Sequence, residues 1–402
     1  MTDGPLFLFD DAIADAWAPF ALTRPIGELV FGRWSARERL ERAWGGRVRG
    51  HVIRPWLARF SEGGAPRAIG ADDLPEGPLT LWSSRAVPAA STPRPGGPAN
   101  LWLADRLAGV RLGPGAEPPD RAWLAAPSPR PDLPDETVSG EWLERPWDLV
   151  ARGPERLAAD LGRSVGTSGS PVPDGCLKLG DGPLETGEGT RIEPGVLFDA
   201  RDGPIVLDRN VEVRAGTRLA GPLYAGPASR LLGGSIQALS AGPRSYVRGE
   251  IEKVTMLGWA NKAHDGFLGH AYVGRWVNLG AMTTNSDLKN NYGTIRMGPP
   301  DAAVDTGLVK LGCLLGDHVK TGIGVLLTTG AVIGAGSNLF GSELAPRWVE
   351  PFSWGRGEDL VHYRRDAFLA TAARVVARRG VDADEALLGW LGDVWDRARG
   401  DG

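Results

Sequence analysis

A six-residue rhythm of aliphatic side chains constrains the fold of this chain more than any other feature. Beyond about residue 175, an aliphatic residue recurs at every sixth position, and small or polar residues fill the intervals. The rhythm forms three runs: Leu207, Val213, Leu219, Ala225 and Leu231; Phe267, Val273 and Leu279; and Val309, Leu315, Thr321, Leu327, Ile333 and Leu339, in which only the threonine breaks the pattern. An α-helix repeats at about 3.6 residues and a half-buried strand at about 2, so neither element explains it.

This period predicts a β-helix over residues 175–345. In that architecture short strands turn corners around a narrow prism, each recurring aliphatic side chain points inward, and small residues lie where the backbone passes close. The unit from Ile333 to Asn338, with its sequence Ile-Gly-Ala-Gly-Ser-Asn, fits this pattern. A strand-rich sandwich would not keep the phase over successive units.

The rhythm fails between Asn285 and Gly307. This stretch is rich in asparagine and contains the turn sequence Gly298-Pro299-Pro300, so we expect an exposed loop that leaves the coil. Loops held by a rigid scaffold commonly carry function.

Three further regions complete the expected organisation. Residues 1–145 are predicted to form an α/β domain, with a buried strand at Leu6–Phe9, a helix over 27–44 and an irregular loop over the proline-rich stretch 113–134. Residues 146–174 are predicted to be a linker with a helix over 147–161. Residues 346–402 are predicted to form a helical extension, with one helix over 358–379 and another that starts at Asp382.

The charge and the cysteine content exclude several classes of protein. The chain carries 45 basic and 49 acidic side chains, net −4, which points to neither nucleic acid nor a membrane surface as a partner. Two cysteines cannot form a disulfide framework, and no apolar run reaches the ~18 residues of a spanning helix. The apolar run Leu6–Phe9 is too short for a secretory signal and ends at Asp10, so we expect a cytoplasmic protein.

Polar residues with catalytic potential concentrate between positions 261 and 292. Five of the eight asparagines and two of the five histidines, His264 and His270, lie there, and all six lysines fall between 178 and 320. A neutral imidazole can accept a proton from an attacking amine, Asp265 could fix its tautomer, and lysines can hold phosphate. We expect His264 to be the base and interpret His270 as a turn cap. No nucleophile motif, metal-ligand spacing or glycine-rich phosphate loop is present, so the pattern favours direct transfer without a metal.

The stretches Lys262–His264 and Leu268–Ala281, together with the hexads, resemble the acetyltransferase half of the bifunctional bacterial enzyme that makes UDP-N-acetylglucosamine. The chain as a whole resembles a divergent branch of that family, described as sugar nucleotidyltransferases, through Leu22–Pro25, Pro146–Leu149 and Phe352–Gly355. The resemblance implies a left-handed parallel β-helix, assembled as a homotrimer, with acetyl-CoA bound between adjacent coils.

The same resemblance assigns roles to individual positions. It places His264 at the catalytic base, and Phe267 where a substrate-facing tyrosine is usual, with the ring kept and the hydroxyl lost. The positions expected at the substrate are Lys253, Lys262, Phe267 and Asn278, and those expected at acetyl-CoA are Ala281, Asn291, Tyr292 and Lys310.

The first domain resembles a nucleotidyltransferase through little more than Thr23-Arg24. The glycine-rich loop that would hold the nucleotide phosphates is missing, which leaves Asp10 and Arg24 as candidate nucleotide-binding residues. Mg²⁺ is expected only if this domain is active.

Three functions remain open at this point. The leading one is an acyltransferase that uses acetyl-CoA and an amino-sugar phosphate or nucleotide sugar, of the type that makes UDP-N-acetylglucosamine. The first alternative is a sugar-1-phosphate nucleotidyltransferase whose β-helix serves trimerisation and regulation. The second is a non-catalytic scaffold that binds sugar nucleotides, which the loss of the hydroxyl at Phe267 favours.

Overall fold

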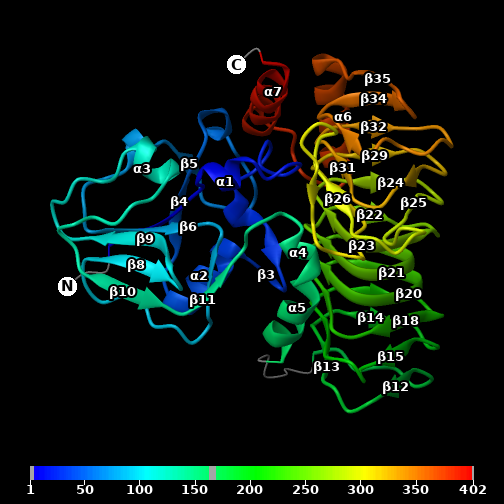
Figure 1. The fold of residues 1–402 in the computed structure, drawn as a ribbon. Coiled ribbons are helices and arrows are strands. Elements are labelled where there is room, and N and C mark those ends of the chain that lie inside the picture. The colour runs from blue at the N-terminus through cyan, green and yellow to red at the C-terminus, as the bar shows by residue number, and fades with distance from the viewer. Residues whose placement is uncertain (1–3, 163–168, 401–402) are drawn as a thin grey trace. The chain divides into compact units, whose positions relative to one another are not determined.

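The computed structural model describes residues 4–162 and 169–400, which divide into two compact units (Figure 1). The first unit comprises Met1–Val30, Trp34–Pro146 and Ala383–Gly402, and the second comprises Phe31–Arg33 and Trp147–Asp382. The segment that begins at Ala383 therefore belongs to the N-terminal unit, whereas the sequence predicts a single helical extension over residues 346–402. None of the described helices combines the length and apolar character needed to cross a bilayer.

The first unit is built on a seven-stranded mixed sheet. Its strand order is β10-β8-β9-β6-β1-β4-β5. The strands are β1 Leu6–Phe9, β4 Val48–Val52, β5 Ala68–Ile69, β6 Leu79–Ser83, β8 Ala99–Leu103, β9 Arg106–Leu112 and β10 Asp135–Val138, and a separate antiparallel pair joins β7 Ala86–Pro88 to β11 Gly140–Trp142. Strand β1 is parallel to β4 on one side and to β6 on the other, in the centre of the sheet.

Successive side chains of β1 point to opposite faces of the sheet and belong to two hydrophobic cores. Leu6 and Leu8 pack with Leu40 of the helix α2 (Ala36–Trp44), whereas Phe7 and Phe9 pack with Leu124 of α3 (Arg121–Ala125). The sheet is thus covered on both faces, which is the reason for its continuous apolar central strand. The predicted α/β domain is confirmed.

Local capping explains where the helices of this unit differ from the sequence prediction. The helix expected over 27–44 starts only at Ala36, because Ser35 and Glu38 form a capping box; a 3-10 turn, Ile26–Glu28, precedes it. Asp120 caps α3 inside the stretch expected to be irregular. Asp384, and not Asp382, caps α7 (Glu385–Arg399).

Helix α7 packs on the first unit through two kinds of contact. The Trp390 and Phe60 ring centroids lie 5.2 Å apart in an edge-on arrangement, and Arg59 pairs with Asp393. Its apolar face, including Leu391 and Val394, is buried.

The second unit is a parallel β-helix, which confirms the prediction for this region (Figure 1). Its strands are β12 Leu177–Leu179, β13 Leu184–Thr186, β14 Arg191–Ile192, β15 Leu197–Asp199, β16 Ile205–Leu207, β17 Glu212–Val213, β18 Thr217–Ala220, β19 Leu223–Ala225, β20 Arg230–Ala241, β21 Tyr246–Met256, β22 Asn261–Lys262, β23 Phe267–Val273, β24 Asn278–Leu279, β25 Thr284–Asn285, β28 Cys313–Leu315, β29 Lys320–Thr321, β30 Leu326–Leu327, β31 Ala331–Ile333, β32 Asn338–Leu339, β33 Trp348–Val349, β34 Ser353–Arg356 and β35 Asp359–His362.

The pairing register shows how the hexads build the coil. Ile205 pairs with Leu223 and Cys313 with Ala331, and each of these steps along the chain equals three hexads. A regular coil therefore holds three hexads. The recurring aliphatic residues form one continuous core along the prism, in which Leu219 and Ile333 have no exposed surface.

Two residues of the hexad runs lie outside the prism. Phe267 is half-buried and its neighbour Leu268 points inward, while Val309 is 44% exposed. The phase slips at Phe267 because the coils around it are shorter: Tyr246 pairs with Asn261, a step of less than three hexads. Val309 lies outside because it belongs to an inserted segment.

The insertion predicted after Asn285 is confirmed. Tyr272 pairs with Leu314, so this one coil extends over the length of seven hexads where a regular coil has three. The additional chain lies between β25 and β28. The inserted segment, residues 286–312, carries the antiparallel pair β26 Arg296–Met297 and β27 Val304–Asp305.

Short helices cover part of the β-helix. The helix predicted over 147–161 forms as α4 (Asp148–Ala151) and α5 (Gly153–Leu161), and Leu157 and Leu161 of α5 pack against Val206. Helix α6 (Arg365–Ala377) places Phe368 4.8 Å from the ring of Phe352 at the last coils.

Candidate functional site

The first candidate site lies at the carboxyl ends of the central strands of the first unit. The chain passes from β1 to β4 on one side and returns to β6 on the other, so the strand order reverses at β1. Ligands of open α/β sheets bind in the crevice at such a reversal. Asp10 directly follows β1 and Ser84 directly follows β6, so both lie at this crevice.

Internal contacts occupy the carboxylate of Asp10. It accepts hydrogen bonds from the Ser84 hydroxyl and from the backbone N–H of Ile26, and its Oδ2 lies 3.1 Å from the Arg54 guanidinium. Asp10 is only 7% exposed. Both of its carboxylate oxygens are therefore already bonded to neighbouring residues of the chain.

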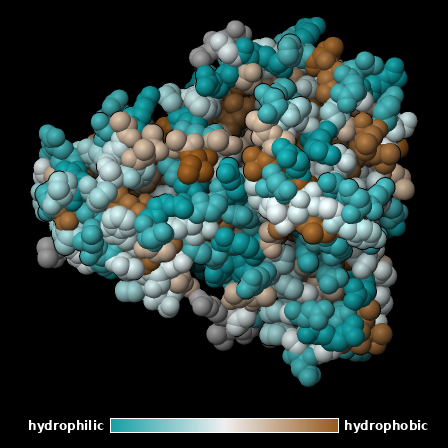
Figure 2. Space-filling view, in the orientation of Figure 1, coloured by the Kyte–Doolittle hydropathy of each residue, from teal (hydrophilic) through white to brown (hydrophobic). Residues whose placement is uncertain are grey.

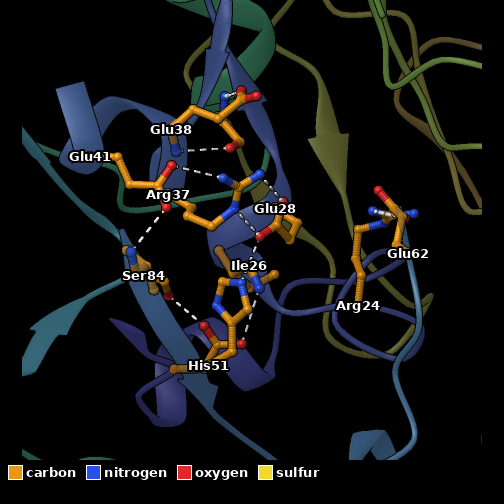
Figure 3. Close-up of polar contacts among 12 residues, drawn as sticks. Arg24, Ile26, Glu28, Arg37, Glu38, Glu41, His51, Glu62 and Ser84 are labelled. Carbon is orange, nitrogen blue, oxygen red and sulfur yellow. Dashed lines mark hydrogen bonds and ion pairs between the residues drawn. The ribbon is translucent and has the colours of Figure 1, made fainter. Parts of the chain in front are cut away.

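The second candidate nucleotide-binding residue, Arg24, is also held by an internal ion pair. Its side chain is 1% exposed, and Nη1 lies 2.9 Å from Oε2 of Glu62 (Figure 3). The hollow that remains beside Asp10 and Trp56 has a volume of about 220 Å³. Sites for small molecules typically enclose ~300–1,000 Å³.

A buried charge cluster stabilises the same region. Glu28 accepts hydrogen bonds from His51 Nε2 at 2.7 Å and from Arg37 Nε at 2.6 Å (Figure 3). Burial opposes its ionisation, but the hydrogen bonds and charges of His51 and Arg37 outweigh burial and lower the pKa of Glu28 to about 2. This cluster holds the turn that follows Arg24 against β4.

The residues at this crevice do not fit a Mg²⁺ ion. A magnesium site needs oxygen ligands that are free to coordinate, and the Asp10 oxygens face an arginine and two hydrogen-bond donors. Among the described residues there is no group of three or more His, Cys, Asp or Glu side chains arranged to hold a metal ion.

The second candidate site lies on the β-helix, where the structure separates the two histidines. His264 is exposed at a coil corner, and the residue expected to orient it, Asp265, instead accepts a 3.0 Å hydrogen bond from Arg248 Nε. His270 is 5% exposed on β23, and its Nδ1 lies 2.7 Å from Oδ2 of Asp287. The carboxylate-oriented imidazole is therefore His270.

Lys262 points into the prism, away from any surface where a substrate could bind. It has no exposed surface, and its Nζ donates to the carbonyl oxygens of Arg248 and His264. Loss of hydration on burial lowers its pKa to about 8. Lys320 makes similar bonds to the carbonyls of Trp276 and His318, and its pKa is lowered to about 7.

In the described part of the chain, four other predicted residues form no hydrogen bond with His270 or Asp287. Asn278 accepts a 2.7 Å hydrogen bond from Asn261 on the preceding coil, and the Ala281 carbonyl accepts one from the Gly324 N–H. In the inserted segment, Asn291 accepts from the Gly293 N–H, and Tyr292 is 71% exposed.

Three predicted residues gather around His270. Lys253 occupies the same corner one coil earlier, because its neighbours Glu252 and Val254 pair with Gly269 and Ala271. Lys310 lies 3.9 Å from Glu252, and an added Cβ on Gly269 would touch the Phe267 ring. Two lysines, an aromatic ring and an imidazole–carboxylate pair thus form one corner site. Sequence reasoning missed Asp287 because it lies in the segment where the rhythm fails.

Two comparisons with known proteins bear on these sites. Residues 6–164 match the family model described as sugar nucleotidyl transferase. A protein of Sulfurisphaera tokodaii named bifunctional sugar-1-phosphate nucleotidylyltransferase/acetyltransferase is 24% identical over 161 residues, which cover 37% of this chain and 38% of that protein. The match therefore spans well under half of the relative. Both names are those of transferases, the enzyme class expected from the sequence.

Proposed function

We propose that this chain is an acyltransferase that moves the acetyl group of acetyl-CoA to the amine of an amino-sugar phosphate or nucleotide sugar. The observation that carries the proposal is the corner site, in which an oriented imidazole lies beside two lysines on a parallel β-helix. The acetyltransferase part of the relative's name supports it.

Each group of the corner site suits one requirement of this reaction. Attack of an amine on a thioester requires a base to take the amine proton, and a neutral imidazole supplies one near pH 7. The ammonium groups of Lys253 and Lys310 attract a phosphate as point charges. The half-buried Phe267 ring offers an apolar surface to a sugar ring. The finer assignment, synthesis of the precursor of UDP-N-acetylglucosamine, rests on the resemblance of Lys262–His264 and Leu268–Ala281.

A homotrimer is part of this proposal. Apolar side chains are exposed on the later coils of the β-helix, and brown patches lie over this unit in Figure 2. Those with the highest exposed fractions on these coils are Met282, Ile323, Leu344 and Val361. Patches of this kind mark interaction surfaces. Light scattering coupled to gel filtration tests the trimer, and a molar mass near the 42.7 kDa of one chain would contradict it.

Nucleotidyl transfer is the second candidate, favoured by the family match over residues 6–164. The internal contacts of its two candidate residues argue against it, because Asp10 bonds Ser84 and Arg24 pairs with Glu62. Pyrophosphate release from UTP and a sugar 1-phosphate in the presence of Mg²⁺ would support this candidate.

The deciding experiment compares both reactions on one preparation of the full chain. Free thiol is followed with acetyl-CoA and glucosamine 1-phosphate, and pyrophosphate with UTP or dTTP and the same sugar. We expect thiol release that depends on the amine, without pyrophosphate. Binding of the sugar nucleotide without either turnover would instead support the scaffold function.

A further inference from the structure

The His270–Asp287 pair is built by several elements and is not a chance contact. The side-chain amide of Asn285 bonds the backbone of Gly269 in both directions: Oδ1 accepts from its N–H at 2.8 Å, and Nδ2 donates to its carbonyl at 2.9 Å. This clamp fixes the start of the inserted segment beside β23. Asp287, which follows Asn285 closely in the chain, then reaches Nδ1 of His270.

The end of the inserted segment forms backbone hydrogen bonds with both members of the pair. Leu311 N–H donates to the carbonyl of Asp287, and Gly312 N–H donates to the carbonyl of His270, both at 2.9 Å. Two glycines leave the room for this arrangement. A Cβ on Gly269 would lie 3.0 Å from the Asp287 carboxylate, and one on Gly312 would lie 2.0 Å from the carbonyl oxygen of Gly269.

This geometry determines which nitrogen of His270 can act as a base. A carboxylate beside Nδ1 holds the proton on that nitrogen and leaves the lone pair on Nε2. No described residue forms a hydrogen bond with Nε2. This atom is also not one of the fully buried side-chain nitrogens and oxygens that lack a partner in the described residues. The small exposure that the ring retains therefore includes Nε2.

Burial is the main cause that favours the neutral form of the His270 ring. Loss of hydration lowers the pKa of His270, and Lys253 adds to this effect, whereas Asp287 and Glu252 oppose it. Lys310 faces the same corner and lies 3.9 Å from Glu252. A neutral imidazole with an open Nε2 and an oriented Nδ1 has the form that general-base catalysis needs.

We propose that His270, oriented by Asp287, is the residue that accepts the proton in acyl transfer, a role the sequence assigned to His264. This inference rests on the proposed function. The amine nitrogen bonds to the thioester carbonyl carbon, the carbon–sulfur bond breaks, and the amine proton passes to Nε2 of His270. The imidazolium returns that proton to the departing thiolate, which leaves an amide and a free thiol. Asp287 acts through His270 and is a positioning residue.

The test measures kcat and KM for thiol release from acetyl-CoA with glucosamine 1-phosphate, from pH 5.5 to 9. The variants are His270→Gln, Asp287→Asn, their double variant and, as the matched control, His264→Gln. Circular dichroism checks the fold of each one. If His270→Gln does not fold, Asp287→Asn carries the test, because an amide at this position favours the wrong tautomer of the imidazole.

We expect His270→Gln to lower kcat by about 10²–10⁴-fold with little change in KM, and to abolish the acidic limb of the pH profile. His264→Gln should keep that limb. The double variant should be no slower than His270→Gln, since both changes remove one function. Loss of the limb in His264→Gln, with the limb retained in His270→Gln, would overturn the assignment but leave acyl transfer intact. Wild-type protein without thiol release would refute the proposed function itself.

Discussion

Replacement of Lys262 by methionine distinguishes an interior lysine from a substrate-binding one. Lys262 has no exposed surface and bonds only backbone carbonyls, so we expect Lys262→Met to change how stability depends on pH. The ordinary pKa of 10.5 applies to the unfolded chain, while loss of hydration lowers the pKa in the fold to about 8.

The size of the effect follows from linkage. Between these two values the unfolded chain binds a proton that the folded chain does not, so the free energy of unfolding rises with pH. At about 1.36 kcal/mol for each pH unit, the full difference is about 3 kcal/mol, and most of it falls between pH 7 and 10. The wild type should therefore gain most of that amount relative to Lys262→Met over this range. Lys320 is present in both proteins and cancels.

Urea unfolding of both proteins at pH 7, 8, 9 and 10, followed by circular dichroism of the β-helix, measures this difference. Lys178→Met is the control, because Lys178 is exposed on β12, and its curve should stay parallel to the wild type. A constant gap between wild type and Lys262→Met at all four pH values would refute the interior position.

Three further predictions concern stability. Glu28→Gln should lower the free energy of unfolding of the first unit most above pH 4.5. Because the pKa of Glu28 is lowered to about 2, the difference in this free energy between wild type and variant should narrow as the pH falls from 4.5 towards 2. A difference that stays constant when urea unfolding is measured over this pH range would contradict the prediction. Gly269→Ala would place Cβ 2.2 Å from Cζ of Phe267 and should cost about 1–3 kcal/mol by calorimetry, whereas Gly63→Ala, with no atom within 4 Å of its Cβ, should be neutral. Leu239→Ala, in the prism with no exposed surface, should cost about 2–5 kcal/mol in urea unfolding, and a cost equal to that of Leu177→Ala, at a residue 66% exposed, would argue against the prism core.

The sequence predicts the architecture well because the hexads report directly on the interior of the prism. Leu219 and Ile333 are buried as their phase requires. The failures at Phe267 and Val309 have a physical cause. A shortened coil shifts the phase of the six-residue period at Phe267, and the insertion extends past Gly307, so that it includes Val309.

The site is less predictable than the fold. The Asn285 amide, which bonds the backbone of Gly269, helps to place Asp287 beside His270, and no spacing in the sequence predicts this contact. The interior position of Lys262 is equally difficult to predict from the sequence, because lysine is rarely fully buried. His264, which the sequence nominates as the base, lies at an exposed corner, and its neighbour Asp265 accepts a hydrogen bond from Arg248.

The most direct test of the central claim is identification of the reaction product by mass spectrometry. The full chain is incubated with acetyl-CoA labelled in the acetyl group and with glucosamine 1-phosphate. The account predicts a sugar phosphate that carries the labelled acetyl group on its nitrogen, in amounts equal to the thiol released. Unlabelled sugar phosphate alongside intact acetyl-CoA, after prolonged incubation with folded protein, would contradict it.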